Sequence, residues 1–249
     1  MCYLSQESIT ISDEHLSTIF KFAQKYADND LWKFFLSDEH RQIDKWLHYF
    51  EVYDKWFKDF RNKDIVFVEI GVQNGGSAQM WRHYFGDKAT IIGVDIDERC
   101  KQFDSDDIKI EIGSQEDVEF WNTFKEKYPR VDILLDDGGH TMAQQIITFQ
   151  CMFDHIADGG IYLCEDTHTS YWAEYGAVDE KSAENNYTEF AKTFIDEVNA
   201  FHSRGKVPIS NNTLTMHGLH FYDSMVVIEK QQRLLGPVSL KIGKQFIFD

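Results

Sequence analysis

The sequence has little of several residue types, and each shortage narrows what the protein can be. Three prolines and no Pro- or Ser-rich stretch in 249 residues give no sign of a linker, which favours one domain with an extension. Basic residues number 25 against 42 acids, a formal net charge of −17, so we expect no nucleic acid and no membrane surface as a partner. The few cysteines lack the spacing of a metal site. They are Cys2, Cys100, Cys151 and Cys164.

Long apolar runs and targeting signals are also missing. No apolar run is long enough to span a bilayer. The first residues, Met1 to Ser8, do not combine a basic region with an apolar one, so no secretory signal is expected. Scattered cysteines without a framework fit a reducing compartment. We therefore expect a soluble cytoplasmic protein.

Residues 1–60 carry helical patterns. Asp13 is placed to cap a helix whose apolar residues run from Leu16 to Ala23. A second helix is predicted from about Asp38 to Phe60, because aromatic residues recur at helical spacing. These rings either pack as a stripe on the rest of the protein or cover a cofactor or acceptor, and Tyr49 and His48 are candidates for such contact. The rings are Trp46, Tyr49, Phe50, Tyr53, Trp56 and Phe57.

From Asp64 onward, short apolar runs alternate with helical stretches, which is typical of βαβ units. Five such strands and a final pair joined by a tight turn predict an α/β fold with a doubly wound, mostly parallel, seven-stranded Rossmann-like sheet. Residues 61–249 would form this domain and residues 1–60 an N-terminal helical extension. Residues 170–186 are acidic and aromatic without periodicity, which predicts a lid or insertion. The strands are expected at 65–71, 90–95, 108–112, 131–136, from 160, and at 214–223 and 224–230, with helices to 85 and at 117–127, 141–153 and 186–201.

Two of these strands end in paired acids. Asp136 and Asp137 end one strand, with His140 just beyond, and Glu165 and Asp166 end the next. Ligands bind beyond the carboxyl ends of such strands, so four carboxylates would meet at one edge if the strands are neighbours. That many acids need a cation, and oxygen ligands favour Mg²⁺, with Mn²⁺ or Ca²⁺ as alternatives, over Zn²⁺.

Within this acidic edge, the residues are expected to differ in role. Adjacent strand residues point opposite ways, so Asp136 either faces the cofactor side or stabilises the loop. Asp137, Glu165 and Asp166 would be metal ligands, with His140 as general base. An isolated acid pair or histidine is more often structural, and the coincidence of two acidic strand ends favours the metal site. His168, His217 and His220 are secondary candidates.

The first two strands have the pattern of a nucleotide-type site. Gly71 ends the first strand, and Asp95 ends the second, where it can bind ribose hydroxyls. Gln73 replaces the second glycine of the dinucleotide fingerprint, which counts against NAD or a flavin. Glu69 would repel a diphosphate but suits the cationic S-adenosylmethionine. The residues expected on this cofactor are Glu69, Gly71, Asn74, Gly75, Ser77, Asp95, Asp136 and Tyr49, together with Ser114 and Gln115, which either read adenine or serve the turn.

Five motifs in register carry a family resemblance. They are Val68–Ser77 with Met80-Trp81, Gly93–Asp97, Asp136–His140, Gly159–Thr167 with Thr169–Trp172, and His220–Ser224. Together they resemble the class I S-adenosylmethionine-dependent methyltransferases of the macrolide sugar O-methyltransferase group, related to proteins called cephalosporin hydroxylases. The resemblance runs from about His48 to Lys230, and Gly139 stands where the family usually has serine.

The resemblance implies methyl transfer to a sugar hydroxyl of a natural product or glycan precursor. It also implies Mg²⁺ held by Asp137, Glu165 and Asp166, with His140 as base. A phosphorylated or phosphoramidate-type capsule precursor is an alternative acceptor. A Rossmann-like oxidoreductase and a non-catalytic binding module are alternatives of other classes. The resemblance leaves the acceptor and the oligomeric state open, a homo-oligomer included.

Overall fold

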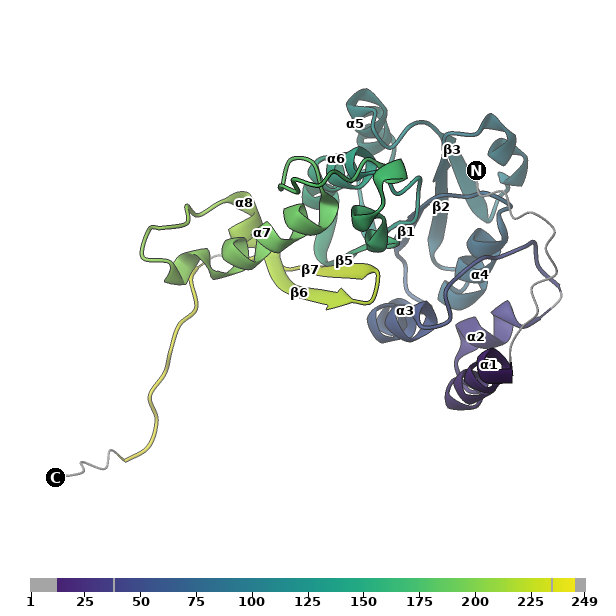
Figure 1. Cartoon of the computed structure of the whole chain (residues 1–249), viewed down its shortest axis with the longest axis horizontal. Coiled ribbons are helices and arrows are strands. Elements are labelled where there is room, and N and C mark those ends of the chain that lie inside the picture. Colours follow the sequence, from purple (N-terminus) through teal and green to yellow (C-terminus); the bar gives the residue numbers. More distant parts are fainter. Residues whose placement is uncertain (1–12, 38, 234, 245–249) are drawn as a thin grey trace.

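A seven-stranded sheet forms the centre of the protein (Figure 1). The computed structural model describes residues 13–37, 39–233 and 235–244, with side chains from Leu16 onward. The strands follow the order β3-β2-β1-β4-β5-β7-β6. Their bounds are β1 Val66–Ile70, β2 Thr90–Asp95, β3 Ile108–Ile112, β4 Val131–Asp136, β5 Ile156–Cys164, β6 Met216–Tyr222 and β7 Met225–Lys230.

The topology confirms the predicted doubly wound sheet. Strands β1 to β5 pair in parallel, and only β7 and β6 run antiparallel to their neighbours, as a hairpin. The strand order reverses between β1 and β4. In open α/β sheets this switch point is where ligands bind, because the connections leave in opposite directions and open a crevice.

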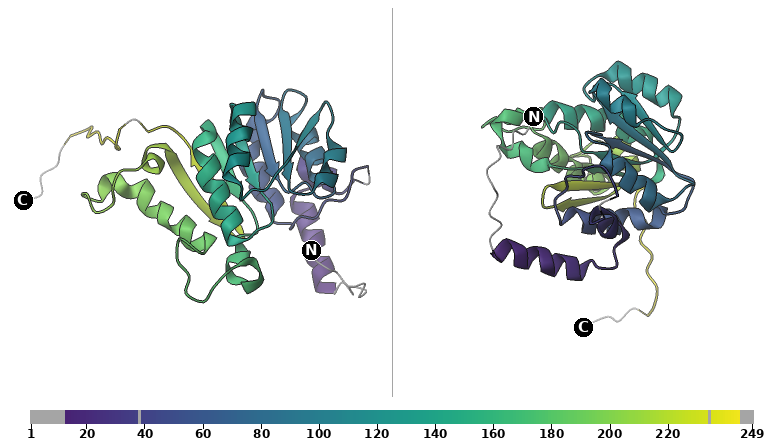
Figure 2. Two further views of the ribbon diagram at one scale, coloured as in Figure 1. Left: turned by 90° about the horizontal axis from the view of Figure 1, so that it is seen from above. Right: turned by 90° about the vertical axis from the view of Figure 1, so that its right-hand side faces the viewer.

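Helices cover both faces of the sheet. One face packs on α2, α3 and α4, and the other on α5, α6 and α7 (Figures 1 and 2). Local capping fixes several boundaries: Thr141 and Gln144 form a capping box at α6, and Asp117 and Asn186 cap α5 and α7. The helices are α1 Asp13–Lys25, α2 Asp30–Phe35, α3 Tyr49–Phe57, α4 Gly76–Phe85, α5 Val118–Lys127, α6 Met142–Met152, α7 Tyr187–Asn199 and α8 Asn211–Thr215.

Strand alternation divides the core into two layers. In β1, Phe67 faces the α3 side and Val68 faces the α6 side, and in β4 Leu135 and Leu134 divide in the same way. This period of two applies equally to the polar residues at the strand ends. It therefore decides on which side of the sheet each acid of the site lies.

The long helix predicted over Asp38–Phe60 is wrong in its first half. Residues 39–48 are not helical, and α3 begins only at Tyr49. Tertiary contacts override the aromatic periodicity here, because this segment crosses the N-terminus of α4. The Arg41 N–H donates to Gln79 Oε1, and a Cβ on Gly76 would lie 2.2 Å from the Arg41 carbonyl oxygen.

The aromatic stripe from Tyr49 onward is buried core. Tyr49, Phe50, Tyr53 and Phe57 are all buried against the same face of the sheet, whereas Trp46 is exposed. The first of the two predicted readings, packing on the sheet, is therefore confirmed for these four rings. Whether the Tyr49 hydroxyl also reaches a cofactor stays a prediction.

The two ends of the described chain lie at the periphery (Figures 1 and 2). On α1, Leu16, Ile19 and Phe20 are exposed, and the predicted cap at Asp13 concerns a side chain outside those described. Residues 235–244 run away from the body as an extended segment. No helix among the described residues has the length and apolarity needed to cross a membrane.

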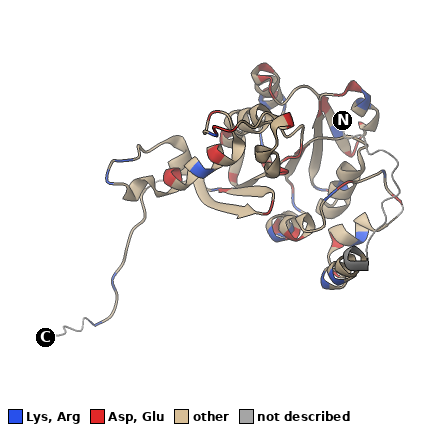
Figure 3. Cartoon of the chain, in the orientation of Figure 1, with Lys and Arg blue, Asp and Glu red and all other residues tan. Residues whose placement is uncertain are grey.

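Acidic side chains are spread over helices and loops of the whole molecule (Figure 3). Lys and Arg are interspersed with them rather than gathered into one region. The acidic residues are therefore not confined to one element of the described chain, and the acids that matter for chemistry have to be identified by burial and geometry.

Candidate active site

Three acids converge on one side of the sheet edge because they share a strand phase. Glu69 follows Val68, Asp137 follows Asp136, and Glu165 follows Cys164, so all three side chains leave their strands toward α3. Strands β1, β4 and β5 are adjacent, and the Glu165 N–H donates to the Asp136 carbonyl at 2.9 Å. The expectation that the two acidic strand ends are neighbours is thus confirmed.

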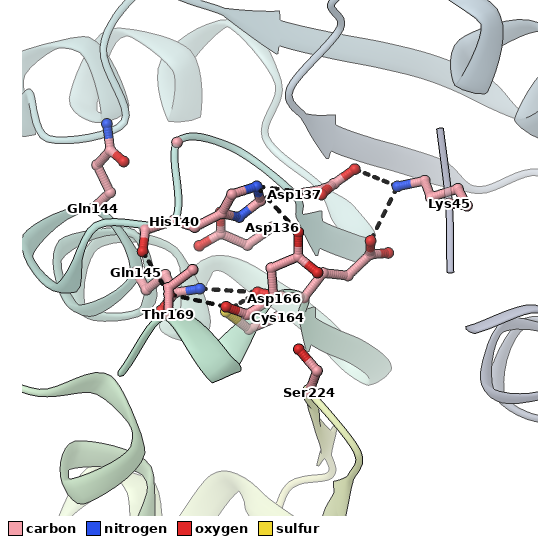
Figure 4. Close-up of polar contacts among 12 residues, drawn as sticks. Lys45, Asp136, Asp137, His140, Gln144, Gln145, Cys164, Asp166, Thr169 and Ser224 are labelled. Atoms are coloured by element: carbon pink, nitrogen blue, oxygen red, sulfur yellow. Dashed lines mark hydrogen bonds and ion pairs between the residues drawn. The ribbon is translucent and has the colours of Figure 1, made fainter. Parts of the chain in front are cut away.

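A lysine lies among these acids (Figure 4). The Lys45 ammonium donates to Asp137 Oδ2 and, at 3.0 Å, to Glu165 Oε2, and it lies 3.9 Å from Glu69 Oε1. Burial lowers the pKa of Lys45, but Asp137, Glu165 and Glu69 raise that pKa by more, to well above its usual value. The ammonium is therefore charged at every physiological pH.

Burial disfavours the charged forms of two of the acids. Burial raises the pKa of Glu69 to about 7, with Lys45 acting in the opposite direction. It also raises the pKa of Glu165 well above the usual value, with further repulsion from Asp137 and opposition from Lys45. Tyr53 donates its hydroxyl to Glu165 Oε1, so both oxygens of that carboxyl have a partner within the protein.

Asp136, one of the four acids predicted to meet at the sheet edge, lies on the opposite side of the sheet from Asp137 and Glu165. Its carboxylate accepts hydrogen bonds from Gln115 Nε2 at 2.9 Å and from the Tyr162 hydroxyl at 3.3 Å. Burial raises the pKa of Asp136 to about 6. Only three of the four expected carboxylates, Asp137, Glu165 and Asp166, therefore meet, and Asp136 has the loop-stabilising role that was one of its two predicted roles.

A group of side chains that could hold a metal ion lies at this edge, and the ligand set of Asp137, Glu165 and Asp166 stays a prediction. One ligand atom each from Asp137, His140 and Asp166 lie within 4.8 Å of one another. Their oxygen atoms fit a hard dication such as Mg²⁺. Glu165 is not in this group, because its two oxygens bond to Tyr53 and Lys45.

His140 is held beside two acids without being tied to a structural bond. Its Nε2 lies 3.4 Å from Asp166 Oδ2 and 3.9 Å from Asp137 Oδ1. Its Nδ1 is buried and has no hydrogen-bond partner among the described residues. The Nε2 atom therefore faces the carboxylates of Asp137 and Asp166.

The loops of the site adopt unusual backbone conformations. Gln73, His140, Asp166 and Ser224 all have positive φ, from 46° to 62°. Such conformations cost about 1–3 kcal/mol in non-glycine residues, and they cluster where function over-determines the backbone. The Thr169 hydroxyl is within hydrogen-bond distance of the His140 and Asp166 carbonyls, at 2.8 and 2.9 Å, and so links the two loops (Figure 4).

Two hollows meet at the end of β1. The acidic pocket is lined by residues 42–46 and Tyr49 on one wall and by Asp137, His140, Glu165 and Asp166 on the other. The strand-end pocket is lined by residues at the ends of β1 to β4, among them Asp95, Ser114 and Gln115. Gly71 and Gln73 line both, so one extended ligand can occupy the two hollows across the β1 turn.

The predicted cofactor residues fall into two groups. Gly71, Asn74, Ser77, Tyr49, Asp95, Ser114 and Gln115 line one or both hollows. Glu69, Gly75 and Asp136 line neither. The Glu69 carboxylate accepts from Ser77 at 2.7 Å and from Trp81 at 2.9 Å, which supports the β1 turn from below.

Asp95 also supports this turn. Its Oδ2 accepts from the Val72 and Gln73 N–H groups at 2.8 and 3.0 Å, and its Oδ1 accepts from Asp97. The carboxylate has lone pairs left over on Oδ1 for a ribose hydroxyl, and that contact stays a prediction. Gln115 ties the Asp136 loop together through Gly139, and Ser114 accepts from Glu116, as in ordinary turn chemistry.

The secondary histidines differ in position. His168 stacks on Trp46, with ring centroids 5.0 Å apart, beside the acidic pocket. His220 pairs with Glu229 on the terminal hairpin, and His217 is exposed there. None of the three histidines lines the acidic pocket, but His168 Nδ1 lies 4.0 Å from Asp166 Oδ1, which places His168 next to the site.

Sequence reasoning missed the wall of residues 42–46, Lys45 above all. The residues that Lys45 contacts lie 92 and 120 positions further along the chain, so no local sequence pattern predicts these contacts. The assignment of this segment to a helix also hid it. A signal was available in Tyr49 and Tyr53, since a buried tyrosine hydroxyl needs a polar partner: Tyr49 donates to Asp166 at 2.6 Å.

Comparison with known proteins agrees with this fold. The sheet order and flanking helices are those of the Rossmann-like methyltransferase fold. A solved structure of the MycE methyltransferase from the mycinamycin pathway, in complex with Mg, SAH and mycinamycin VI, has a TM-score of 0.72 to this chain. The two sequences are 27% identical, and the matched region covers 98% of this chain and 66% of the MycE chain.

The curated relatives are sugar O-methyltransferases, which confirms the resemblance carried by the motifs. Mycinamicin VI 2''-O-methyltransferase of Micromonospora griseorubida is 31% identical over 216 residues, covering 80% of this chain and 52% of that protein. Demethylmacrocin O-methyltransferase of Streptomyces fradiae is 30% identical over 216 residues, covering 81% and 54%. The chain thus spans about half the length of the curated relatives it matches. No protein-family profile matches it.

Proposed function

We propose that this protein is a metal-dependent O-methyltransferase that moves the methyl group of S-adenosylmethionine to a hydroxyl of a sugar in a glycan or natural-product precursor. The observation that carries the proposal is the convergence of Asp137, Asp166 and His140 at the end of a pocket continuous with the β1 turn. The relatives named above act on sugars of natural products, which supports the same class of acceptor here.

The cofactor would lie across the β1 turn. Its adenosine part fits the strand-end pocket, with Asp95 beside the ribose and Ser114 beside the base. Its methionyl part fits the acidic pocket next to Gly71 and Ser77, which brings the sulfonium toward Asp137. Gly71 is required for this path, because a Cβ there would lie 2.0 Å from the Asp137 carbonyl oxygen.

The chemistry needs a nucleophile in line with the methyl group, and a sugar hydroxyl is a weak nucleophile near neutral pH. Mg²⁺ held by Asp137 and Asp166, with Glu165 behind them, would supply a positive charge that lowers the pKa of the bound hydroxyl. His140 Nε2 would take the hydroxyl proton, a contribution of roughly 10²–10⁴-fold. Asp166 then stabilises the imidazolium and keeps the ring oriented.

The acceptor would enter past exposed aromatic side chains. Trp46 and Trp172 pack against His168 at the rim, and both are exposed. Such faces suit the apolar side of a sugar ring. Residues 170–186 are held at this rim by short 3-10 turns, and we propose that they act as the lid.

A methyl-transfer assay with labelled S-adenosylmethionine tests the proposal. We expect transfer to one or more members of a panel of glycosides and nucleotide sugars, dependent on Mg²⁺ and abolished by EDTA. Thermal shift with S-adenosylmethionine and with NAD separates the methyltransferase from an oxidoreductase. Full activity after EDTA treatment would contradict the metal, and stabilisation by NAD alone would contradict the reaction.

A further inference from the structure

We propose that Lys45 is a built-in competitor of the metal ion: its ammonium neutralises Asp137 and Glu165 while the site is free of metal, and a divalent cation has to displace it in order to bind. This inference rests on the metal site of the proposed function. It goes beyond that function because it assigns a role to a residue that is neither a metal ligand nor a base.

The contacts of Lys45 carry the inference. Its ammonium bonds to Asp137 Oδ2, an oxygen of a proposed metal ligand (Figure 4), and to Glu165 Oε2 on the neighbouring buried acid. The Lys45 side chain is only 3% exposed, so it is a buried residue and not a surface lysine. A dication held by Asp137 and Asp166 would lie within a few ångströms of the ammonium, because Lys45 bonds to Asp137, and two positive charges at that distance repel strongly.

A competitor of this kind has a structural reason. Glu69 and Glu165 are buried, and Asp137 lies next to them. Without the metal and without Lys45, these neighbouring buried carboxyls would have to be protonated or remain charged without a cation, and either state destabilises the fold. Lys45 therefore keeps the metal-free protein folded at the expense of metal affinity.

The position of Lys45 in the chain allows it to move. It lies in the non-helical segment 39–48, and Gln42 to Trp46 form one wall of the acidic pocket. Its flexible four-carbon stem lets the ammonium swing into the pocket without unwinding α3. The neighbouring anchors, Arg41 on Gln79 and Tyr49 on Asp166, do not involve Lys45.

Binding of Mn²⁺, followed by electron paramagnetic resonance on the metal-free full chain, tests the inference. Lys45→Gln should bind Mn²⁺ more tightly than the wild type by on the order of 10- to 1,000-fold, since it removes a like charge a few ångströms from the ion. Lys45→Arg keeps the charge and should bind no more tightly than the wild type. Lys33→Gln, at an exposed lysine paired with Asp30, is the matched control and should not differ from the wild type.

Thermal unfolding gives a second readout. In EDTA, Lys45→Gln should unfold at a lower temperature than the wild type, and saturating Mn²⁺ should raise its Tm by more than it raises that of the wild type. A Lys45→Gln protein that fails to fold even with saturating Mn²⁺ would overturn the inference, because the ion is then unable to replace the ammonium.

The outcomes separate the two proposals. If the wild type binds Mn²⁺ and Lys45→Gln binds it equally or less tightly, the competitor role is wrong and the metal site stands. If neither protein binds Mn²⁺, the metal site of the proposed function is wrong and the role of Lys45 falls with it.

Discussion

Glu69 shows how burial changes the meaning of a residue read from sequence. The sequence placed a free carboxylate beside a cationic cofactor, but the side chain is 1% exposed and bonded to Ser77 and Trp81. It stabilises the β1 turn and belongs to the charge cluster around Lys45. A carboxyl in this position prefers to be neutral, and its pKa is raised to about 7 by burial, against the opposing effect of Lys45.

Replacement of Glu69 by glutamine should make stability less dependent on pH. The folded-state pKa of about 7 exceeds the ordinary value of 4.5, so the folded state binds the proton more tightly. The associated stability is present below pH 4.5 and is lost as pH rises through 7, by up to about 3 kcal/mol. Relative to the wild type, Glu69→Gln should therefore gain stability between pH 5 and pH 8, measured by urea unfolding in EDTA.

The matched control for this measurement is Glu126→Gln, an exposed acid on α5. Its stability relative to the wild type should not change over the same pH range. The glutamine keeps an oxygen that can accept from the Trp81 N–H, and its NH2 group can donate to Ser77 Oγ, so these hydrogen bonds add no pH dependence and the slope stays readable. A difference between Glu69→Gln and the wild type that is flat with pH would contradict the assignment.

His140→Gln should separate chemistry from binding. It removes the proposed base and leaves Asp137 and Asp166 in place, so methyl transfer should fall by roughly 10²–10⁴-fold. Affinities for Mn²⁺ and S-adenosylmethionine, from resonance and calorimetry, should stay near those of the wild type. Raising the pH should recover part of the rate, because the acceptor hydroxyl then ionises unaided. If His140→Gln turns over normally, His168 is the next base to test.

The sequence predicts the positions of residues that depend on strand alternation, and it misses those that depend on contacts with distant parts of the chain. The acids at the ends of β4 and β5 were found because each follows an apolar run, and their convergence follows from strand adjacency. The sequence does not decide on which side of the sheet Asp136 lies. Lys45 was out of reach, because its position depends on a segment that crosses the fold far from it in sequence.

At the scale of elements, the sheet could be predicted and the first helices could not. Strands β2, β3 and β4 have the predicted bounds, since β2 and β4 are mostly apolar and β3 alternates isoleucine with charged residues. Strand β5 begins earlier than expected, at Ile156, with an irregular register before Ile161. The Asp38–Phe60 prediction failed because aromatic spacing cannot reveal that residues 39–48 are held against α4.

The crossing of the β1 turn over the β4 loop gives an element-scale prediction. Gly71 has φ +96°, and a Cβ there would lie 2.0 Å from the Asp137 carbonyl oxygen. Gly159 also has positive φ, +81°, but has open space around it. Gly159→Ala should cost about 1–2 kcal/mol of backbone strain. Gly71→Ala should cost more and should also weaken cofactor binding, because the turn and the Asp137 loop have to separate.

Urea unfolding and calorimetric titration with S-adenosylmethionine measure the two glycine variants side by side. The excess loss of stability in Gly71→Ala isolates the clash from the strain that both share. Equal losses in the two variants, with unchanged cofactor affinity in Gly71→Ala, would show that the β1 turn is free to move and that this crossing does not shape the site.

At the scale of the molecule, the described part of residues 1–60 shares a hydrophobic core with the sheet. Leu31 and Trp32 of α2 and the aromatic rings of α3 lie in the same buried cluster as Phe67 and Leu135 of the sheet. Segment 39–48 supplies a wall of the acidic pocket and the Lys45 ammonium. The boundary predicted at residue 60 separates helical from alternating sequence patterns, and pattern alone does not report which residues share a core.

Truncation tests whether that boundary is a domain boundary. A chain of residues 29–249 loses α1, whose described contacts with the core are made by partly buried residues, Phe22 and Ala23, so it should fold with a lowered Tm. A chain of residues 61–249 loses the buried rings of α2 and α3 and exposes one face of the sheet, so it should not unfold cooperatively and should aggregate. Circular dichroism melts and size-exclusion chromatography distinguish the two. Cooperative unfolding of 61–249 would instead establish the sheet as an independent domain, with Lys45 as an accessory to a site complete without it.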